Sequence, residues 1–461
     1  LSGLVGSEMC IRDSDYVSRR TDLPSEQIVT AARMFASGPR GAASTGTGPE
    51  MSPRGSLTEH MVMTINAVCG RYYREGEVPA AAPPLSVGRQ PKAQVVFPPQ
   101  AWGEGFVKSR FRGLTQIGDE MPCNVMADEI LTPGEGQIRA LFSIGGNPMV
   151  AFPNQDKIAR ALEDLDLLVA IDPWLSATSR RADYILGPKV ALEREDATLL
   201  GEMYFEEPYA HYTEAMVEPQ GDTIEEWEFY WELAARLSIP LSIHGQPVPM
   251  DQCPSKYQIT ELVAHGSRVS LAKVKAETEQ QGGKIFDEAR AVVGPKSAHN
   301  HHRFRVLPDD VKQQLAEVAQ EPLNQLGLRV AEEGYSHLLI SRRIKQFFNS
   351  TGHNLDALRQ KGTTNYAYMH PDDLANMGLS SEAMVEISSP AGSVIGLVKA
   401  SNDLKVGVIS MAHAFGDTNS DTSNVMLQGS STNRLVSDEQ HFDPITGQAR
   451  QSAIPVSIRA L

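Results

Sequence analysis

The sequence has few cysteines, few basic residues and no long apolar run, and each shortage excludes a class of protein. Four cysteines occur among 461 residues, far apart and without a CxxC pair or a histidine at zinc-ligand spacing, so neither a disulfide scaffold nor a zinc site is predicted. No apolar run approaches the roughly 18 residues of a spanning helix. With 42 basic against 57 acidic residues, the net charge of −15 disfavours nucleic acid and anionic membranes as partners.

Common catalytic motifs are absent as well. The sequence contains no Gly-x-Ser-x-Gly, HExxH or Walker loop, so hydrolase and phosphoryl-transfer chemistry have no support. Gly46-x-Gly48 is not a dinucleotide fingerprint, because the third glycine is missing. His299, His301 and His302 lie in a polar stretch without carboxylates at useful spacing, which favours an exposed loop over a metal site.

What is present is the composition of a globular protein of about three domains. Hydrophobic residues make up 41% of the chain and charged residues 21%. The first fourteen residues, Leu1 to Ser14, resemble translated sequencing-adapter sequence, so they are left out of the fold prediction. The alternative is a genuine short N-terminal segment. Under the first interpretation the natural N-terminus is missing.

Residues 15–244 have the pattern of an α/β domain. Residues 24–37 predict a helix with Ser25 as its N-cap, and residues 57–69 have the length of a second helix. Two apolar runs, 138–144 and 167–171, flank a helix with one apolar face. Such a strand–helix–strand unit is typical of a parallel sheet covered by helices. A third short run at 184–186 and an amphipathic helix at 223–237 follow.

The remainder of the chain changes character twice. Residues 245–335 are polar and helix-prone, which predicts a helical connector. Residues 336–461 contain short β-rich runs and one short helix that begins at His370-Pro371 and ends at Gly378, which predicts a compact barrel. The predicted strands lie at 336–341, 383–389, 393–400 and 406–412.

Two loops at predicted strand ends carry candidate ligand-binding residues, since ligands bind at the carboxyl ends of parallel strands. Gly145 and Gly146 lack side chains, so a diphosphate could approach their amides, and Asn147 can bond a ligand. An ordinary tight turn is the alternative. Asp172 can accept two hydrogen bonds from ribose hydroxyls or a guanine edge, or it can be a helix cap before Pro173.

Together these motifs resemble the molybdopterin oxidoreductases of the dimethyl sulfoxide reductase family, which includes formate dehydrogenases and periplasmic nitrate reductases. Motifs in the C-terminal segment support the resemblance independently of those in the predicted sheet. The residues that carry the resemblance are Leu141-Phe142-x-x-Gly-Gly-Asn147-Pro148, Asp172, TSRRADYIL at 178–186, Leu192 to Glu195, Ser341-Arg342-Arg343, Asn349-Ser350-Thr351-Gly352, His370-Pro371-x-Asp373, and Asn433-Arg434-Leu435 before Asp443-Pro444.

The resemblance implies a parallel-sheet, Rossmann-like cofactor domain followed by a C-terminal β-barrel of the double-psi type. It also implies a cofactor, bis-molybdopterin guanine dinucleotide with molybdenum or tungsten. The loops at 146, 172 and 349 should then face a shared cleft. By resemblance, the residues that contact the cofactor are Thr47, Gly48 and Met51 along one dinucleotide; Gly146, Asn147, Ile171, Asp172 and Arg194 at its diphosphate and guanosine end, with Glu225 as a further guanine contact; and Ser341, Arg342, Arg343, Asn349, Ser350, Phe415 and Asn433 at the other dinucleotide.

The resemblance further implies part of an oxidoreductase that acts on a small-molecule substrate by two-electron redox chemistry or oxygen-atom transfer, with an electron-transfer subunit as partner. No residue here is assigned as catalytic or as a metal ligand. The cysteine motif for a 4Fe–4S cluster and the metal ligand would lie upstream, so the fragment is expected to be inactive alone. One alternative is a pterin-free structural or electron-transfer subunit. Another is a nicotinamide-binding α/β dehydrogenase, supported only by the strand–helix–strand unit.

Overall fold

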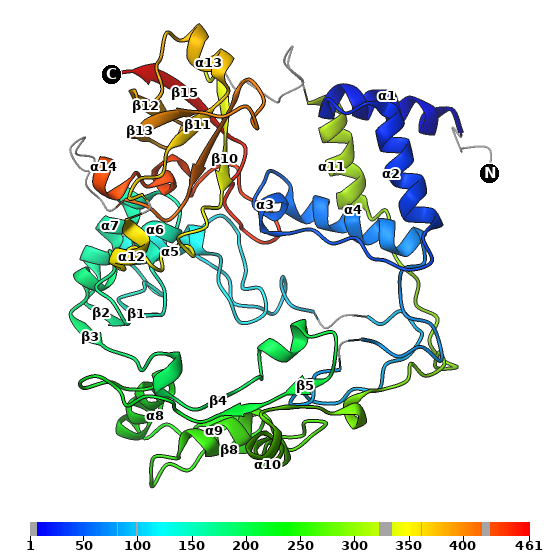
Figure 1. Cartoon of the computed structure of the whole chain (residues 1–461), viewed down its shortest axis with the longest axis vertical. Helices are drawn as coiled ribbons and strands as arrows, with labels where there is room; N and C mark the ends of the chain where they lie inside the picture. Colours follow the sequence, from blue (N-terminus) through cyan, green and yellow to red (C-terminus); the bar gives the residue numbers. More distant parts are fainter. Residues whose placement is uncertain (1–6, 81, 98–99, 322–333, 361, 417–424) are drawn as a thin grey trace.

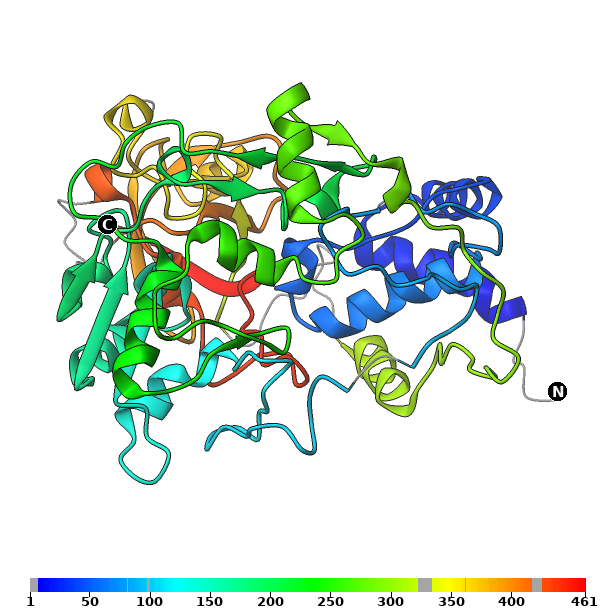
Figure 2. The same cartoon turned by 90° about the horizontal axis from the view of Figure 1, so that it is seen from below.

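The computed structural model describes residues 7–80, 82–97, 100–321, 334–360, 362–416 and 425–461. Figure 1 shows three groups of elements: the barrel with the α/β layer beneath it, a group of helices beside the N-terminus, and a third group at the bottom of the view. Figure 2, seen from below, likewise separates the blue N-terminal helices from the barrel. No helix of the described ranges is both long enough and apolar enough to cross a bilayer.

The α/β layer contains a three-stranded parallel sheet in the order β1-β2-β3. Strand β2 reads LLVAI and is buried after its first residue, as expected of a strand covered on both faces. Ile130, Met149, Ile158 and Leu168 form the core beneath the sheet. The predicted strand–helix–strand unit is therefore confirmed. Its elements are α5 (Met126–Leu131), β1 (Ala140–Ile144), α6 (Pro148–Ala151), α7 (Gln155–Asp164), β2 (Leu167–Ile171) and β3 (Tyr184–Leu186).

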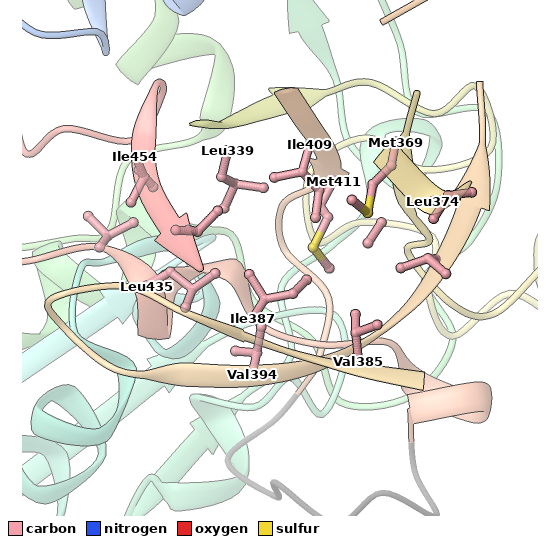
Figure 3. Packing of buried hydrophobic residues seen from close by; sticks show 14 of the residues in the cluster. Leu339, Met369, Leu374, Val385, Ile387, Val394, Ile409, Met411, Leu435 and Ile454 are labelled. Carbon is pink, nitrogen blue, oxygen red and sulfur yellow. The ribbon is translucent and has the colours of Figure 1, made fainter. Parts of the chain in front are cut away.

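The C-terminal region forms a closed six-stranded barrel in the order β10-β14-β11-β13-β12-β15. Figure 3 shows its core, where Leu339 of β10, Ile387 of β12 and Ile409 and Met411 of β14 point toward one another. The four predicted strands and the short helix are confirmed, whereas β11 and β15 were not predicted. The elements are β10 (His337–Arg342), α12 (Asp356–Arg359), β11 (Ala367–Met369), α13 (Pro371–Asn376), β12 (Met384–Ser388), β13 (Ser393–Ala400), β14 (Val408–Ala412), α14 (Val425–Gln428) and β15 (Ile454–Ala460).

Helices dominate the N-terminal group. The two predicted helices are present, but Ser25 is the first helical residue and Pro24 occupies the N-cap, so the predicted cap was wrong. The Ser25 hydroxyl instead donates to Asp15. Residues 7–14 begin the first helix, while 1–6 lie outside the described residues, and the adapter origin of 1–14 stays a prediction. The group comprises α1 (Ser7–Thr21), α2 (Ser25–Ser37), α3 (Thr47–Glu50), α4 (Gly55–Val68) and α11 (Asp309–Gln320).

The third group packs around Tyr212, Val274 and Phe286. Residues 245–335 supply helices to two groups: α9 and α10 lie here, whereas Glu317 of α11 pairs with Arg54 before α4. The domain boundaries stay predictions, and residues 322–333 lie outside the described ranges. The elements are β4 (Asp196–Ala197), β5 (Tyr209–Ala210), β6 (Tyr212–Thr213), α8 (Glu226–Leu237), β7 (Ser242–Ile243), β8 (Gln246–Pro247), α9 (Lys256–Val263), α10 (Leu271–Gln281) and β9 (Lys284–Ile285).

Candidate functional site

Two adjoining cavities lie where the barrel meets the α/β layer. The larger, which we call the barrel cavity, has a volume of about 640 Å³. The smaller, which we call the sheet-end cavity, has a volume of about 320 Å³. Val150, Ser350 and Ala414 belong to the walls of both. Because these volumes are typical of small-molecule and cofactor sites, the two cavities together suit one extended ligand.

The barrel cavity brings together residues that are far apart in the chain. Its walls come from the segment around α3, from β10 and the loop after it, and from the segment before β15. More than half of the residues predicted to hold a cofactor are among them. These are Thr47, Gly48, Met51, Ser341, Arg342, Arg343, Asn349, Ser350 and Asn433.

The sheet-end cavity gathers the loops that follow the parallel strands. Asn147 comes from the loop after β1, Trp174 from the loop after β2, and Ser350 and Phe415 from the barrel side. The loops at 146, 172 and 349 therefore face one cavity, as the resemblance requires. Gly146, Asp172 and Asn349 are not themselves wall residues of this cavity; Asn147, Trp174 and Ser350 represent their loops there.

Of the two glycines in the loop after β1, Gly145 is the one whose backbone conformation favours glycine. Its φ of 59° lies in the left-handed region, and its amide donates to the carbonyl of Ile171 at 2.9 Å. A side chain at Gly146 would make only ordinary contacts. The Asn147 Oδ1 accepts from the amide and the hydroxyl of Thr178, at 3.2 and 2.8 Å. Asn147 thus fixes the β1 loop to the loop after β2.

The loop after β2 is ordered by Asp172 itself. This residue is buried, and its Oδ1 accepts from the amide of Trp174 at 3.1 Å. The sequence left open a helix cap at this position, but within the described residues no helix directly follows Asp172, so that alternative was wrong and the carboxylate orders a turn instead. Ordering the turn and binding a ligand do not exclude each other, because a carboxylate has two oxygens with several acceptor sites. The side chain of Ile171 is fully buried in the sheet core, so only its backbone can reach a ligand.

A hydrogen-bonded network on the barrel side centres on Asn349. Its Oδ1 accepts from Arg343 and lies 3.0 Å from Nε2 of His413, whose Nδ1 lies 3.1 Å from the Ser341 hydroxyl. Burial, reinforced by the positive charge of Arg343, lowers the pKa of His413. The imidazole is then neutral, with Nε2–H donating to Asn349 and Nδ1 accepting from Ser341. Asn349 adopts a left-handed φ of 53°.

Sequence reasoning missed His413, although it follows β14 directly and a polar residue at a strand end was the available signal. It also missed Cys123, which lines the barrel cavity. Burial raises the pKa of this thiol to about 11, so it is protonated at neutral pH and is a poor nucleophile.

Aromatic rings form one side of the sheet-end cavity. The His353 ring stacks on Phe347 with centroids 4.3 Å apart and meets the edge of Phe415 at 4.5 Å. Burial lowers the pKa of His353, so this ring is neutral as well. At the barrel cavity, the guanidinium of Arg342 lies 3.7 Å from the ring centroid of Tyr368. The site thus offers flat apolar surfaces beside fixed cationic groups.

Arg194 and Glu225 lie in a different cavity, of about 320 Å³, in the third group. Within the described residues, its walls share no member with the other two cavities. Glu225 is buried and forms ion pairs with Lys189 and Lys256 at 3.6 and 3.3 Å. The structure therefore does not bring these two predicted residues to the site, and their cofactor contacts stay predictions.

The wall chemistry fits a long ligand with phosphates and flat rings. Arg342 and Arg343 supply positive charge, the hydroxyls of Thr47 and Ser350 supply further donors, and the aromatic rings supply stacking surfaces. A molybdopterin dinucleotide has these parts, so the residues present fit the predicted cofactor.

Two family models match different parts of the chain. Residues 338–455 match the "Molydopterin dinucleotide binding domain", which spans nearly the whole barrel. Residues 34–236 match "Molybdopterin oxidoreductase". The chain belongs to the molybdopterin oxidoreductases of the dimethyl sulfoxide reductase family. The barrel cavity of this family member therefore lies largely within its dinucleotide-binding domain.

Individual relatives agree with the family. The probable oxidoreductase YyaE of Bacillus subtilis is 31% identical over 29% of this chain and 20% of its own length. Trimethylamine-N-oxide reductase of Haemophilus influenzae is 21% identical over 87% of this chain and 52% of its own. F420-dependent formate dehydrogenase 1 subunit alpha of Methanococcus maripaludis is 24% identical over 63% of this chain and 40% of its own length. The chain thus spans about half the length of these relatives or less.

Among solved structures, acetylene hydratase from Pelobacter acetylenicus matches with a TM-score of 0.49 and 19% identity, over 76% of this chain and 47% of that one.

Proposed function

We propose that this chain forms the dinucleotide-holding part of a molybdenum- or tungsten-dependent oxidoreductase whose cofactor is bis-molybdopterin guanine dinucleotide. The observation that carries the proposal is the meeting of two distant segments. Thr47 to Met51 and Ser341 to Ser350 line one cavity, and this cavity adjoins the one at the sheet ends. An extended ligand with two dinucleotide arms needs such a pair of connected sites.

The residues divide by the arm that they hold. Thr47, Gly48 and Met51 border one arm, and the sheet-end loops with Gly146, Asn147 and Asp172 receive its diphosphate and guanosine. The residues that hold the other arm are Ser341, Arg342, Arg343, Asn349, Ser350, Phe415 and Asn433.

Each group of side chains has a physical task. Arg342 and Arg343 offset phosphate charge in a partly dehydrated site, where such pairs are stronger than in water. The neutral His413 holds Asn349 in place, so the loop does not have to reorganise when ligand binds. When bound, the cofactor supplies a metal that exchanges two electrons with substrate. The chain's own residues orient the cofactor and compensate its charge.

The activity of the whole protein is also part of the proposal. We infer a small-molecule substrate, transformed by two-electron redox chemistry or oxygen-atom transfer, and an electron-transfer subunit as partner. Relatives support this inference through their names, which include a trimethylamine-N-oxide reductase and the alpha subunits of formate dehydrogenases. A 4Fe–4S cluster and the residue that ligates the metal would be supplied by polypeptide outside this chain.

The test is cofactor content. The complete gene is expressed, and the purified protein is analysed for molybdenum and tungsten by mass spectrometry and for pterin by fluorescence after oxidation. We expect about two pterins per metal ion. A folded protein that contains neither metal nor pterin would overturn the proposal and favour the pterin-free subunit. Bound nicotinamide without guanine dinucleotide would favour the dehydrogenase.

A further inference from the structure

The barrel and the α/β layer are joined by a polar seam, which we define as residues 152–157 and 433–439. The Asn433 Nδ2 donates to the carbonyl of Phe152 at 2.8 Å. The amide of Asn154 donates to the carbonyls of Asn433 and Val436, each at 3.0 Å. These contacts join chain segments nearly 280 residues apart, so they decide how the two domains meet.

Lys157 lies at the centre of this seam. Its side chain is buried, and its Nζ lies 2.6 Å from Asp128 Oδ1, 2.6 Å from Asp438 Oδ2 and 3.2 Å from Glu439 Oε1. The three carboxylates are close enough to one another to hold a metal ion, but the ammonium group already occupies the position between them. Lys157 therefore supplies the positive charge that this cluster requires.

The electrostatics favour the charged forms of Lys157 and Asp128. Burial alone would lower the pKa of Lys157, yet the Asp128 and Asp438 carboxylates outweigh burial and raise it. Burial would likewise raise the pKa of Asp128, but Lys157 and Arg112 outweigh it and lower that pKa. A buried pair of this kind is screened little by salt.

The seam also bounds the barrel cavity. Phe152 on the α/β side and Asn433 and Val436 on the barrel side are wall residues of this cavity. The same backbone that lines the cavity is therefore held by the ion pairs of Lys157, which adjoins it. The distance between the α/β wall and the barrel wall of this cavity therefore depends on the contacts of the seam remaining intact.

We propose that Lys157 is a positioning residue for the cofactor: its ion pair to Asp438 holds the barrel against the α/β layer and so sets the width of the dinucleotide site, while Asp128 on α5 fixes the ammonium group from the α/β side. This inference rests on the proposed function. Without Lys157, the buried Asp438 and the half-buried Asp128 would face each other, and among the described residues Arg112 would remain as their counter-charge. Buried charges that lose a partner repel or draw in water. The seam would then loosen although both apolar cores remain intact.

The experiment measures cofactor loss from purified holoprotein. Pterin per protein is followed during dialysis for wild type, K157M, K157R and the double variant K157M/D438N. We expect K157M to lose pterin roughly tenfold faster, which corresponds to about 1.4 kcal/mol. K157R should stay near wild type because it keeps the charge. The double variant should lose pterin more slowly than K157M, because one unpaired carboxylate has been removed.

A matched control replaces Lys273, whose pair with Glu288 at 2.6 Å is exposed and lies in the third group. K273M should retain pterin as wild type does. Equal retention by K157M and wild type would overturn the proposal. If K157M does not fold, the double variant decides: faster loss than wild type supports the proposal, and wild-type retention overturns it.

A second readout does not need the cofactor. Hydrogen–deuterium exchange of residues 433–439 in cofactor-free protein should be faster in K157M than in K157R. If wild type contains no pterin, the proposed function fails, whereas this exchange measurement still tests the seam. Unchanged exchange in K157M would overturn the role of Lys157.

Discussion

Asp443, in the loop before β15, caps the beginning of α4, almost 400 residues away in the chain. Its Oδ2 accepts from the backbone amide of Ser56 at 3.0 Å and its Oδ1 from the Ser56 hydroxyl at 2.9 Å. A carboxylate at this position satisfies amides that the helix leaves unpaired and interacts favourably with the helix dipole. Because α3 lies just before α4 and carries Thr47 and Gly48, this contact also holds the α3 wall of the barrel cavity.

Asp443→Ala should therefore lower stability. The variant removes a cap from α4 and leaves partly buried amide donors at Ser56, Ile445 and Thr446 without their acceptor. We expect a loss of about 1–3 kcal/mol, measured as a shift of the urea midpoint at unchanged slope. S437A is a suitable control, because among the described residues the Ser437 hydroxyl accepts from the amides of Glu439 and Gln440 in its own turn. Identical midpoints for D443A and wild type would contradict the capping role.

The same carboxylate predicts a dependence of stability on pH. Burial opposes ionisation of Asp443, but hydrogen bonds from the amides of Thr446 and Ser56 outweigh it and lower the pKa. A lowered folded pKa adds stability that is complete above the unfolded value of about 3.9 and is lost as pH falls through the folded value. Wild type should therefore lose more stability than D443N between about pH 5 and pH 2. Parallel curves would argue against this assignment.

Asn349 should control cofactor retention from the barrel side. Replacement by glycine keeps the left-handed backbone but removes the acceptor shared by Arg343 and His413. We expect N349G to lose pterin roughly tenfold faster, about 1–2 kcal/mol, with little change in melting temperature. N349A should in addition be less stable by about 1 kcal/mol because of its backbone strain. Retention equal to wild type in N349G would rule out this role.

Two replacements of Asp172 separate its turn from its ligand role. Asp172→Ala removes the acceptor for the Trp174 amide, so it should lower stability. It should also weaken cofactor binding by about 1–3 kcal/mol, which lowers cofactor occupancy. D172N keeps one oxygen for that amide but replaces the second acceptor oxygen by an NH2 donor, so it cannot accept both ligand hydrogen bonds. We expect D172N to fold normally and to contain less pterin in the same assay. Full pterin content in D172N would leave only the turn role.

The sequence by itself determined the elements whose pattern is local. The run LLVAI at β2 and the apolar face of α7 are complete within a few residues, so their form follows from burial and helical spacing. Strand β11 has three residues and no such pattern. It is a strand because β13 and β14 offer it hydrogen-bonding partners on either side.

The motifs also indicated the family, because each motif is contiguous in the sequence, and the resemblance then named nine residues that line the barrel cavity. Only the tertiary structure decided which motifs share a cavity. It joined Asn147 to Ser350, placed Arg194 and Glu225 elsewhere, and added His413 to the site. It also paired Lys157 with Asp438 across 281 positions. A charged residue carries no local mark of its partner, since that partner is fixed by which faces of the two domains pack together.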